Sequence, residues 1–248
     1  MLRRVLFGAA AVLACSAVVV SADPKDDITA AVQKLADSPN YSWTTTTEGG
    51  MNRGPTEGKT QKDGLTTLSM AMRDNTMEVI VQGDKAAVKT ADGWKSAAEL
   101  MSGGDDGGGP PPPERMAAMM ARNIRTPATQ AKENIDKLTN IQKTDDGYSA
   151  DLSPDAATQM LSFRRRPTAT TATSQPDNAP QMQVSGAKGS VKISIKDGIV
   201  SKIVMHLTGT ITFNDNTRDV DRTTTTEIKD VGTTKIDVPD EAKAKLNS

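Results

Sequence analysis

Few side chains in this sequence are of the kinds that catalysis requires. His206 is the only histidine, and Cys15, the only cysteine, lies close to the N-terminus. A Ser–His–Asp triad, a histidine-rich metal site and a cysteine nucleophile are therefore unsupported in the rest of the chain. His206 lies on the polar face of a predicted strand, where we expect an exposed histidine because catalysis needs partner groups. We predict no catalytic residues and no enzymatic activity, although paired carboxylates, which meet only in space, stay open.

The acidic clusters and the glycine-rich run do not form dedicated binding motifs. Asp105–Asp106 and Asp145–Asp146 lack the alternating oxygen ligands of a calcium loop, and we interpret both pairs as charged turns. The run at 103–109 lacks the lysine and the helix start of a phosphate-binding loop. We therefore predict no metal and no cofactor. The formal net charge is −1, which also argues against nucleic acid, since that partner requires a basic face.

Arg164, Arg165 and Arg166 form a short basic run. Such a cluster could touch anionic lipid head groups, or it could simply begin a solvated linker, since so short a run gives little surface affinity. Transient contact with a membrane surface is the most that we expect from it.

The first 22 residues have the three parts of an export signal. Arg3 and Arg4 form a positive region, Val5–Val20 is an uncharged run, and the sequence ending at Ala22 suits signal peptidase. A transmembrane anchor is the alternative, but this run falls short of the ~20 residues that cross a bilayer as a helix. We predict cleavage after Ala22 and a periplasmic or secreted protein.

Cys15 leaves a second cellular location open, that of a membrane-anchored lipoprotein. Val12–Cys15 (VLAC) is a loose lipobox, and cleavage before Cys15 followed by acylation would give a membrane-anchored lipoprotein. Leu13 at the second position of the box and the apolar run after Cys15 both argue against this outcome. Cleavage after Ala22 leaves the mature protein without cysteine, so its stability must come from a hydrophobic core rather than from disulfides.

Residues 23–248 are predicted to form a single domain that begins with a helix and continues with strands. Asp26–Ala36 places its apolar residues on one helical face and ends before Pro39. Asp-Gly pairs between the candidate strands provide tight turns, which is typical of an antiparallel meander. The predicted strands of this part lie at 41–48, 64–74, 76–82 and 85–90, and the Asp-Gly pairs at 63–64, 92–93, 146–147 and 197–198.

The strongest local pattern is the alternation over residues 199–213. Its odd positions are mostly apolar and its even positions more polar, which predicts a long strand with one dry and one largely wet face. The sequence TTTTE occurs twice, at 44–48 and at 223–227. Because threonine is both β-prone and polar, each copy suits a strand with a solvated face. The flanking residues do not match, so we interpret the copies as two similar strands and not as a duplication.

Helices are predicted in the middle of the chain, and exposed loops beside them. Helix 114–125 carries Met116, Met119, Met120 and Ile124 on one face. The loop at 102–113 is rich in glycine and proline, and the loop at 164–187 has little apolar content. The other helices are predicted at 95–101, 127–138 and 153–163, with a hairpin at 140–152, a strand resuming at 190, and a short strand and a helix from Pro239 at the C-terminus.

The order of these elements resembles the outer-membrane lipoprotein carrier superfamily, with its LolA/LolB-like and LppX/LprG-like proteins. Three stretches carry the resemblance: ADGWKSAAEL at 91–100, DGIVSKIVMHLTG at 197–209 and EIKDVGTTKIDVPDEA at 227–242. The resemblance implies an α+β fold, in which a curved, half-open antiparallel β-sheet (meander) has helices covering its concave face. Members of the superfamily carry lipids or lipoproteins, or hold them at the membrane, without catalysing a reaction.

The resemblance also implies that apolar side chains of the concave face line a ligand groove and that helix 114–124 acts as a lid over it. The candidate lining residues are Met70, Met72, Met77, Val79, Val81, Trp94, Met116, Met119, Met120, Ile124, Ile203, Met205, Leu207, Ile211 and Phe213.

Two functions are compatible with these observations. The first is periplasmic, non-catalytic binding and carriage of a lipid or lipoprotein acyl chain in an apolar groove, by a cofactor-free monomer. The second is a structural or adaptor module of the cell envelope that has the same fold but a filled core and binds protein through its loops. An apolar cavity on the order of several hundred Å³ between sheet and helices would favour the first function, and a core packed shut would favour the second.

Overall fold

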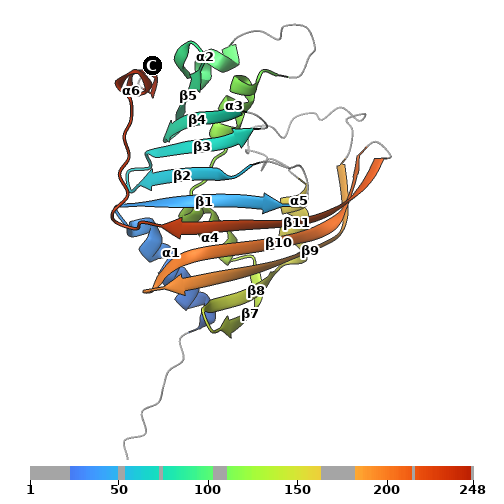
Figure 1. The fold of residues 1–248 in the computed structure, drawn as a ribbon. Helices are drawn as coiled ribbons and strands as arrows, with labels where there is room; N and C mark the ends of the chain where they lie inside the picture. Colours follow the sequence, from blue (N-terminus) through green and yellow to red (C-terminus); the bar gives the residue numbers. More distant parts are fainter. Residues whose placement is uncertain are drawn as a thin grey trace, which may run out of the picture.

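A computed structural model of the chain describes residues 23–49, 54–72, 75–102, 111–162, 182–213 and 216–246. Its centre is an open eleven-stranded sheet with the order β6-β5-β4-β3-β2-β1-β11-β10-β9-β8-β7, in which all neighbours are antiparallel (Figure 1). The strands are β1 (Asn40–Glu48), β2 (Thr56–Gln61), β3 (Thr66–Met72), β4 (Asn75–Gln82), β5 (Lys85–Thr90), β6 (Gly93–Ser96), β7 (Leu138–Thr144), β8 (Gly147–Leu152), β9 (Met182–Lys196), β10 (Ile199–Phe213) and β11 (Asn216–Lys229).

Helices pack on both faces of the sheet. The described helices are α1 (Pro24–Asp37), α2 (Ala97–Ser102), α3 (Pro113–Ala121), α4 (Pro127–Ile135), α5 (Pro154–Leu161) and α6 (Asp240–Leu246). We call the face that carries α1, α3, α4 and α5 the inner face; these helices lie behind the sheet in Figure 1. The opposite, outer face carries α6. The predicted α+β architecture, an open curved sheet with helices on one face, is confirmed, and α6 adds cover on the other face.

Helix α1 forms because its apolar residues recur on one face and its start is capped. Asp23 accepts a hydrogen bond from the backbone N–H of Lys25 at 2.9 Å, and Pro24 occupies a first-turn position where no donor is lost. The helix buries Ile28, Ala31, Val32 and Leu35, which are the predicted residues. They belong to the main hydrophobic core, which fills the space between the inner face and its helices.

Tight turns connect the antiparallel strands where Asp-Gly pairs occur. Asp197 and Gly198 have φ angles of 54° and 72°, as a type I′ turn requires at both central positions. This turn joins β9 to β10, and the predicted strand 199–213 has the predicted bounds.

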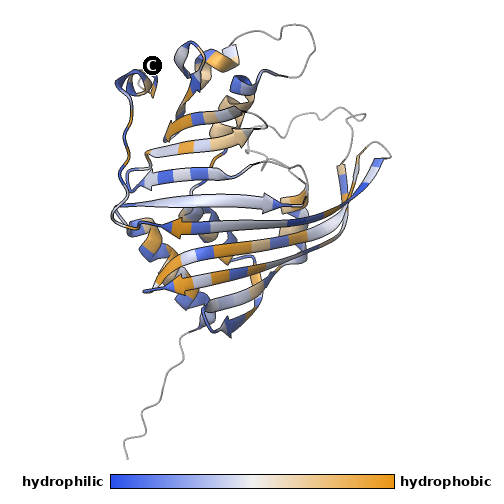
Figure 2. Ribbon diagram, in the orientation of Figure 1, coloured by the Kyte–Doolittle hydropathy of each residue, from blue (hydrophilic) through white to orange (hydrophobic). Residues whose placement is uncertain are grey.

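The two copies of TTTTE pair with each other. β1 and β11 are neighbours, with Thr45 opposite Thr226 and Thr47 opposite Thr224. The hydroxyl oxygens of Thr45 and Thr226 are 2.9 Å apart, within hydrogen-bond distance. We call these paired segments, 44–47 and 223–226, the threonine seam. Their pale colour in Figure 2 separates the more apolar strands β3 and β4 from β9 and β10.

Several predicted elements differ from those in the structure. The helix predicted at 95–101 is Ala97–Ser102, the one predicted at 127–138 ends at Ile135, and β2 was not predicted. β9 begins at Met182, not near Ser190, because Met182 and Val184 pair with Phe213 and Ile211 of β10 and so extend the ladder through part of the predicted loop. Residues 230–239 form turns and extended chain, not a strand, since they leave the ladder and cross the outer face. The helix predicted to reach 125 ends at Ala121 and is followed by a turn.

Several predictions fall outside the described residues. They concern the export signal with Cys15 and Ala22, the acidic pair Asp105–Asp106, and the Arg164–Arg166 run, together with most of both predicted loops. In the described part of the chain, no helix is long and apolar enough to cross a membrane.

Candidate functional site

The inner face of β3–β5 is packed against α3. Met70, Met77 and Val79 are at most 6% exposed, and Val81 is half-buried beside them. The side of α3 that packs here consists of Ala117, Ala118 and Ala121, all of which are at most 1% exposed. Alanine lets a helix approach a sheet closely, so the predicted lining residues of this half lie in a filled core.

The methionines of α3 do not form the side of the helix that packs on the sheet. Met116, Met119 and Met120 are each half-buried. Met120 and Ile124 pack at the margin of the main core. Met72 ends β3, and its side chain is not among those that the structure describes.

The inner face of β10 presents a row of partly exposed apolar side chains. Ile203, Met205 and Ile211 are half-buried, Leu207 is buried, and Phe213 is 44% exposed. Val184 of β9 lies opposite Ile211, and Val220 of β11 lies opposite Gly209. We call the set from Ile203 to Phe213, with Val184 and Val220, the inner apolar row. It contains five of the predicted lining residues.

Helix α5 covers the middle of this row. A Cβ atom at Gly209 would lie 2.7 Å from Cδ1 of Leu161, and one at Gly189 would lie 2.6 Å from Cδ1 of Leu152. These two glycines therefore make room for leucines that pack onto the inner face. Beyond Gly209, towards the end of the hairpin, the row becomes more exposed and reaches its maximum at Phe213.

The threonine seam separates the two apolar halves of the inner face. Thr226 lies between Ile203 and Thr45, and Thr224 lies between Met205 and Thr47. Thr226 is buried, whereas Thr224 and Thr47 are half-buried. The seam thus places hydroxyl groups beside the inner apolar row without adding charge.

Trp94 lies on the outer face, apart from the other predicted lining residues. It forms a second, smaller core with Ile80 and Ala87 of the sheet and with Val238, Ala242 and Leu246 of the C-terminal segment. Because strand side chains alternate between faces, Ile80 and Val79 point to opposite sides of β4. The sequence pattern alone did not separate these two cores.

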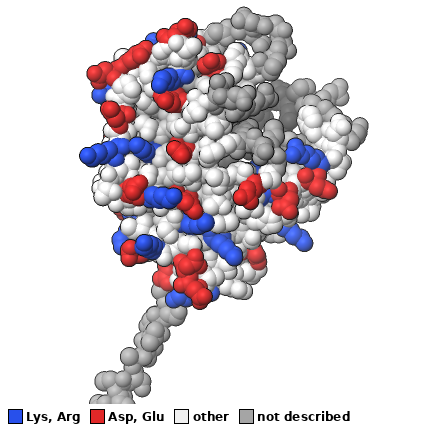
Figure 3. Space-filling model, viewed as in Figure 1, with Lys and Arg blue, Asp and Glu red and all other residues white. Residues whose placement is uncertain are grey.

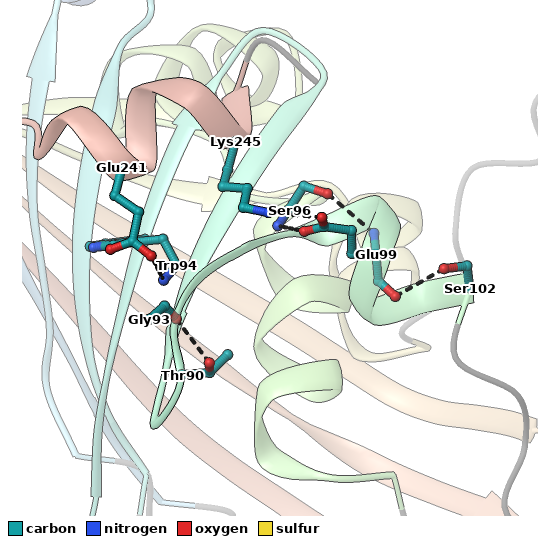
Figure 4. Close-up of polar contacts among 8 residues, drawn as sticks. All are labelled: Thr90, Gly93, Trp94, Ser96, Glu99, Ser102, Glu241 and Lys245. Atoms are coloured by element: carbon teal, nitrogen blue, oxygen red, sulfur yellow. Dashed lines mark hydrogen bonds and ion pairs between the residues drawn. The ribbon is translucent and has the colours of Figure 1, made fainter.

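Polar contacts hold α6 against the edge of the sheet (Figure 4). Glu241 accepts a hydrogen bond from the backbone N–H of Trp94 at 3.0 Å, and Lys245 donates to Glu99 at 2.9 Å. Glu99 also accepts from the backbone N–H of Ser96, while Ser96 caps Glu99 in return. This reciprocal pair is a capping box at the start of α2. The bond from Lys245, followed by the bond from Ser96, holds the pKa of Glu99 below its usual value.

An open groove of about 1340 Å³ lies on the outer face, between β1–β4 and the segment 230–239. Sequence reasoning missed it, because the segment was predicted to be a strand of the sheet. The apolar positions Ile236 and Val238, which precede the apolar residues of α6, are the signal that could have found it. The groove is lined by Ser42, Trp43, Thr44, Glu57, Gly58, Lys59, Gln61, Thr67, Leu68, Ser69, Glu78, Val79, Ile80, Trp94, Asp230, Thr233, Thr234, Lys235, Ile236, Asp237 and Pro239.

Many charged side chains of the described residues form pairs at the surface. His206 and Asp221 interact at 2.8 Å on the outer face, and both are well exposed. Asp146 accepts bonds from Ser194 and Thr144, which lower its pKa and stabilise a turn. Figure 3 shows Lys and Arg intermixed with Asp and Glu on the side in view. Within the described ranges, no group of three or more His, Cys, Asp or Glu residues could hold a metal ion.

Comparison with known proteins gives distant structural likenesses. No family model and no curated protein matches the chain. Solved structures similar to it include the lipoprotein LppX of Mycobacterium tuberculosis (12% identity, TM-score 0.45, 87% of this chain and 98% of that one). They also include LprF of Mycobacterium bovis (8%, 0.45, 90% and 98%) and a DUF1329 family protein of Desulfovibrio piger (8%, 0.31, 88% and 94%).

Proposed function

We propose that the protein binds an acyl chain of a lipid or an acylated lipoprotein, without covalent chemistry, on the inner apolar row. The observation that supports this proposal is the partial exposure of Ile203, Met205 and Ile211 on the same face whose other half, over β3–β5, is largely buried beneath α3. Burying apolar surface gains roughly 0.8 kcal/mol for each methylene group, so even a short segment of chain would bind measurably. Methionine suits such a surface because its flexible thioether adapts to chains of different shape.

In this proposal the protein acts as a carrier in the periplasm or outside the cell, reached through the export signal. The acyl chain replaces water along the row, beside α5, which packs on β9 and β10. Release requires only that the chain finds an equally apolar surface elsewhere, and it needs no cofactor. Helix α5 would have to move for the chain to enter, whereas α3, the lid expected from the sequence, packs on β4 and β5.

A second candidate function is supported by a different observation. The filled core over β3–β5 and the outer groove of about 1340 Å³ would suit an adaptor of the cell envelope that binds a protein segment beneath residues 230–239. The groove is lined by both charged and apolar side chains, as protein interfaces are.

Native mass spectrometry on protein exported by its own host and purified without detergent tests the carrier function. We expect a stoichiometric adduct with the mass of a lipid or acylated peptide, which is lost on organic extraction. Ile211→Lys should weaken uptake of a fluorescent fatty-acid probe more than tenfold, because it places a charge in the row. Thr212→Lys is the matched control, since Thr212 is the next residue of β10 and faces outward.

A bare polypeptide mass together with no uptake of the probe would exclude the carrier function. Equal loss of uptake in both lysine variants would place the probe elsewhere. Crosslinking of a protein partner to the outer groove would then support the adaptor function.

A further inference from the structure

Over residues 216–223, strand β11 places its positive charges on the inner face and its negative charges on the outer face. Residues 216–223 read NTRDVDRT, so Arg218 and Arg222 alternate with Asp219 and Asp221. Arg222 lies opposite Leu207 and Arg218 opposite Ile211, which places both arginines on the inner face beside the inner apolar row. The two aspartates therefore point outward.

The outward aspartates interact with groups of the outer face. Asp221 pairs with His206 at 2.8 Å, and Asp219 accepts a hydrogen bond from the hydroxyl of Thr210 at 2.8 Å. β9 and β10, both described in full, contain neither Asp nor Glu. The inner face of these three strands thus combines aliphatic side chains with positive charge.

Arg222 is the more enclosed of the two arginines. It is half-buried, whereas Arg218 is exposed. Gly49, which follows β1, adds no side chain beside Arg222; a Cβ atom there would lie 3.3 Å from the Cα atom of Arg222. Burial lowers the pKa of Arg222, but a guanidinium stays charged in proteins at neutral pH. A partly desolvated guanidinium favours an anionic partner more strongly than an exposed one does.

The row is long enough for one extended chain, provided that the chain displaces Leu161 of α5 from the space over Gly209. From Leu207, opposite Arg222, to Phe213 the strand advances by six residues, or roughly 20 Å at ~3.4 Å per residue. A single lipid chain spans about half of the ~30 Å hydrocarbon core of a bilayer, or ~15 Å. Val184 and Val220 flank the row on the neighbouring strands.

We propose that the ligand is a long-chain fatty acid, whose carboxylate binds the guanidinium of Arg222 and whose chain lies along the inner apolar row towards Phe213. The inference rests on the proposed acyl-chain binding and narrows its ligand class. The planar fork of arginine matches a carboxylate with two parallel hydrogen bonds, so the head group is recognised as well as the chain. Arg218, four residues nearer to Asn216 on the same face of β11, adds positive charge near Phe213.

Competition with a fluorescent fatty-acid probe tests this inference, with palmitate and hexadecanol as ligands of equal chain length. We expect the wild type to bind palmitate about tenfold more tightly than hexadecanol, as a charge-assisted contact provides. In Arg222→Met the affinity for palmitate should fall to that for hexadecanol, while hexadecanol binding is retained. Retained hexadecanol binding also shows that the variant is folded.

Arg222→Lys separates the effect of the planar guanidinium group from that of its charge, and Lys188→Gln is a control. Arg222→Lys keeps the charge and loses the planar fork, so it should keep only part of the preference for palmitate. Lys188→Gln removes an exposed cation from the outer face of β9 and should leave the preference unchanged.

The outcomes distinguish the two proposals. Equal affinity of the wild type for palmitate and hexadecanol, or a preference that survives in Arg222→Met, overturns the fatty-acid assignment and leaves acyl-chain binding standing. Failure of the wild type to bind either ligand overturns acyl-chain binding itself, and the assignment with it.

Discussion

At the centre of the inner face, the indole ring of Trp43 lies over Gly58 of the neighbouring strand. The two residues pair directly, and a Cβ atom at Gly58 would collide with the six-membered part of the ring. Trp43 is buried, and its N–H donates to the hydroxyl of Thr60 at 3.3 Å. The ring therefore occupies the space that a side chain at position 58 would fill.

Gly58→Ala should destabilise the protein by about 1–3 kcal/mol, because the added methyl group forces the ring or the strand to move. Urea unfolding followed by tryptophan fluorescence measures the change. Lys59→Ala is the control; this exposed neighbour should change stability by less than ~0.5 kcal/mol. An unchanged unfolding midpoint for Gly58→Ala would mean that the ring does not occupy this position.

At the scale of elements, the contacts of α6 should make stability depend on pH. The folded pKa of Glu99 is depressed, chiefly by its bond with Lys245. The carboxylate therefore contributes stability at pH values above the ordinary glutamate pKa of ~4.3, and this contribution disappears as the pH falls through the depressed value.

Glu99→Gln removes this dependence. The wild type should lose more stability than the variant between pH 6 and pH 3, as measured by urea midpoints at each pH. Asp145→Asn, which removes an exposed turn carboxylate, serves as the comparison. Parallel pH profiles for wild type and Glu99→Gln would show that the contact with Lys245 contributes nothing.

The elements that the sequence predicted well are those whose pattern has one physical explanation. The buried face of α1 and the bounds of β10 follow from spacings of 3.6 and 2 residues. The packing side of α3 could not be deduced in this way, since methionine and alanine are both apolar and interleave along the helix. Ala117, Ala118 and Ala121 face the sheet because α3 lies so close to it that only small side chains fit between them. The sequence does not reveal that distance.

The candidate site was predictable in part for the same reason. Alternation placed Ile203, Met205 and Ile211 on one face, but it could not tell which part of that face a helix covers. Trp94 was grouped with the inner face because its strand is too short to show a period. Arg222 was not singled out, since its position beside Leu207 depends on the register between β10 and β11.

At the scale of the whole molecule, the predicted cleavage site of the export signal directly precedes the first helix. Asp23, the residue that caps α1, is also the first residue after the predicted cleavage site at Ala22. Protein recovered from the periplasm or medium should therefore begin at Asp23, which intact mass and N-terminal sequencing determine. Ala22→Leu should block processing, since signal peptidase requires a small residue there. A mature chain that begins with an acylated Cys15 would contradict the prediction and support the lipoprotein alternative.

The described strands lie in the sheet as two runs of consecutive strands, β1 to β6 and β7 to β11. Every adjacent pair joins neighbours in sequence except β1 and β11, which meet at the threonine seam. The sheet is thus two separate meanders joined along one pair of strands, β1 and β11. The residues paired there lie furthest apart in the sequence, so closing this pair costs the most entropy. A chain cut between α2 and α3 would leave each meander whole, so the protein is a natural candidate for assembly from two polypeptides, with a ladder of threonines as the site of complementation.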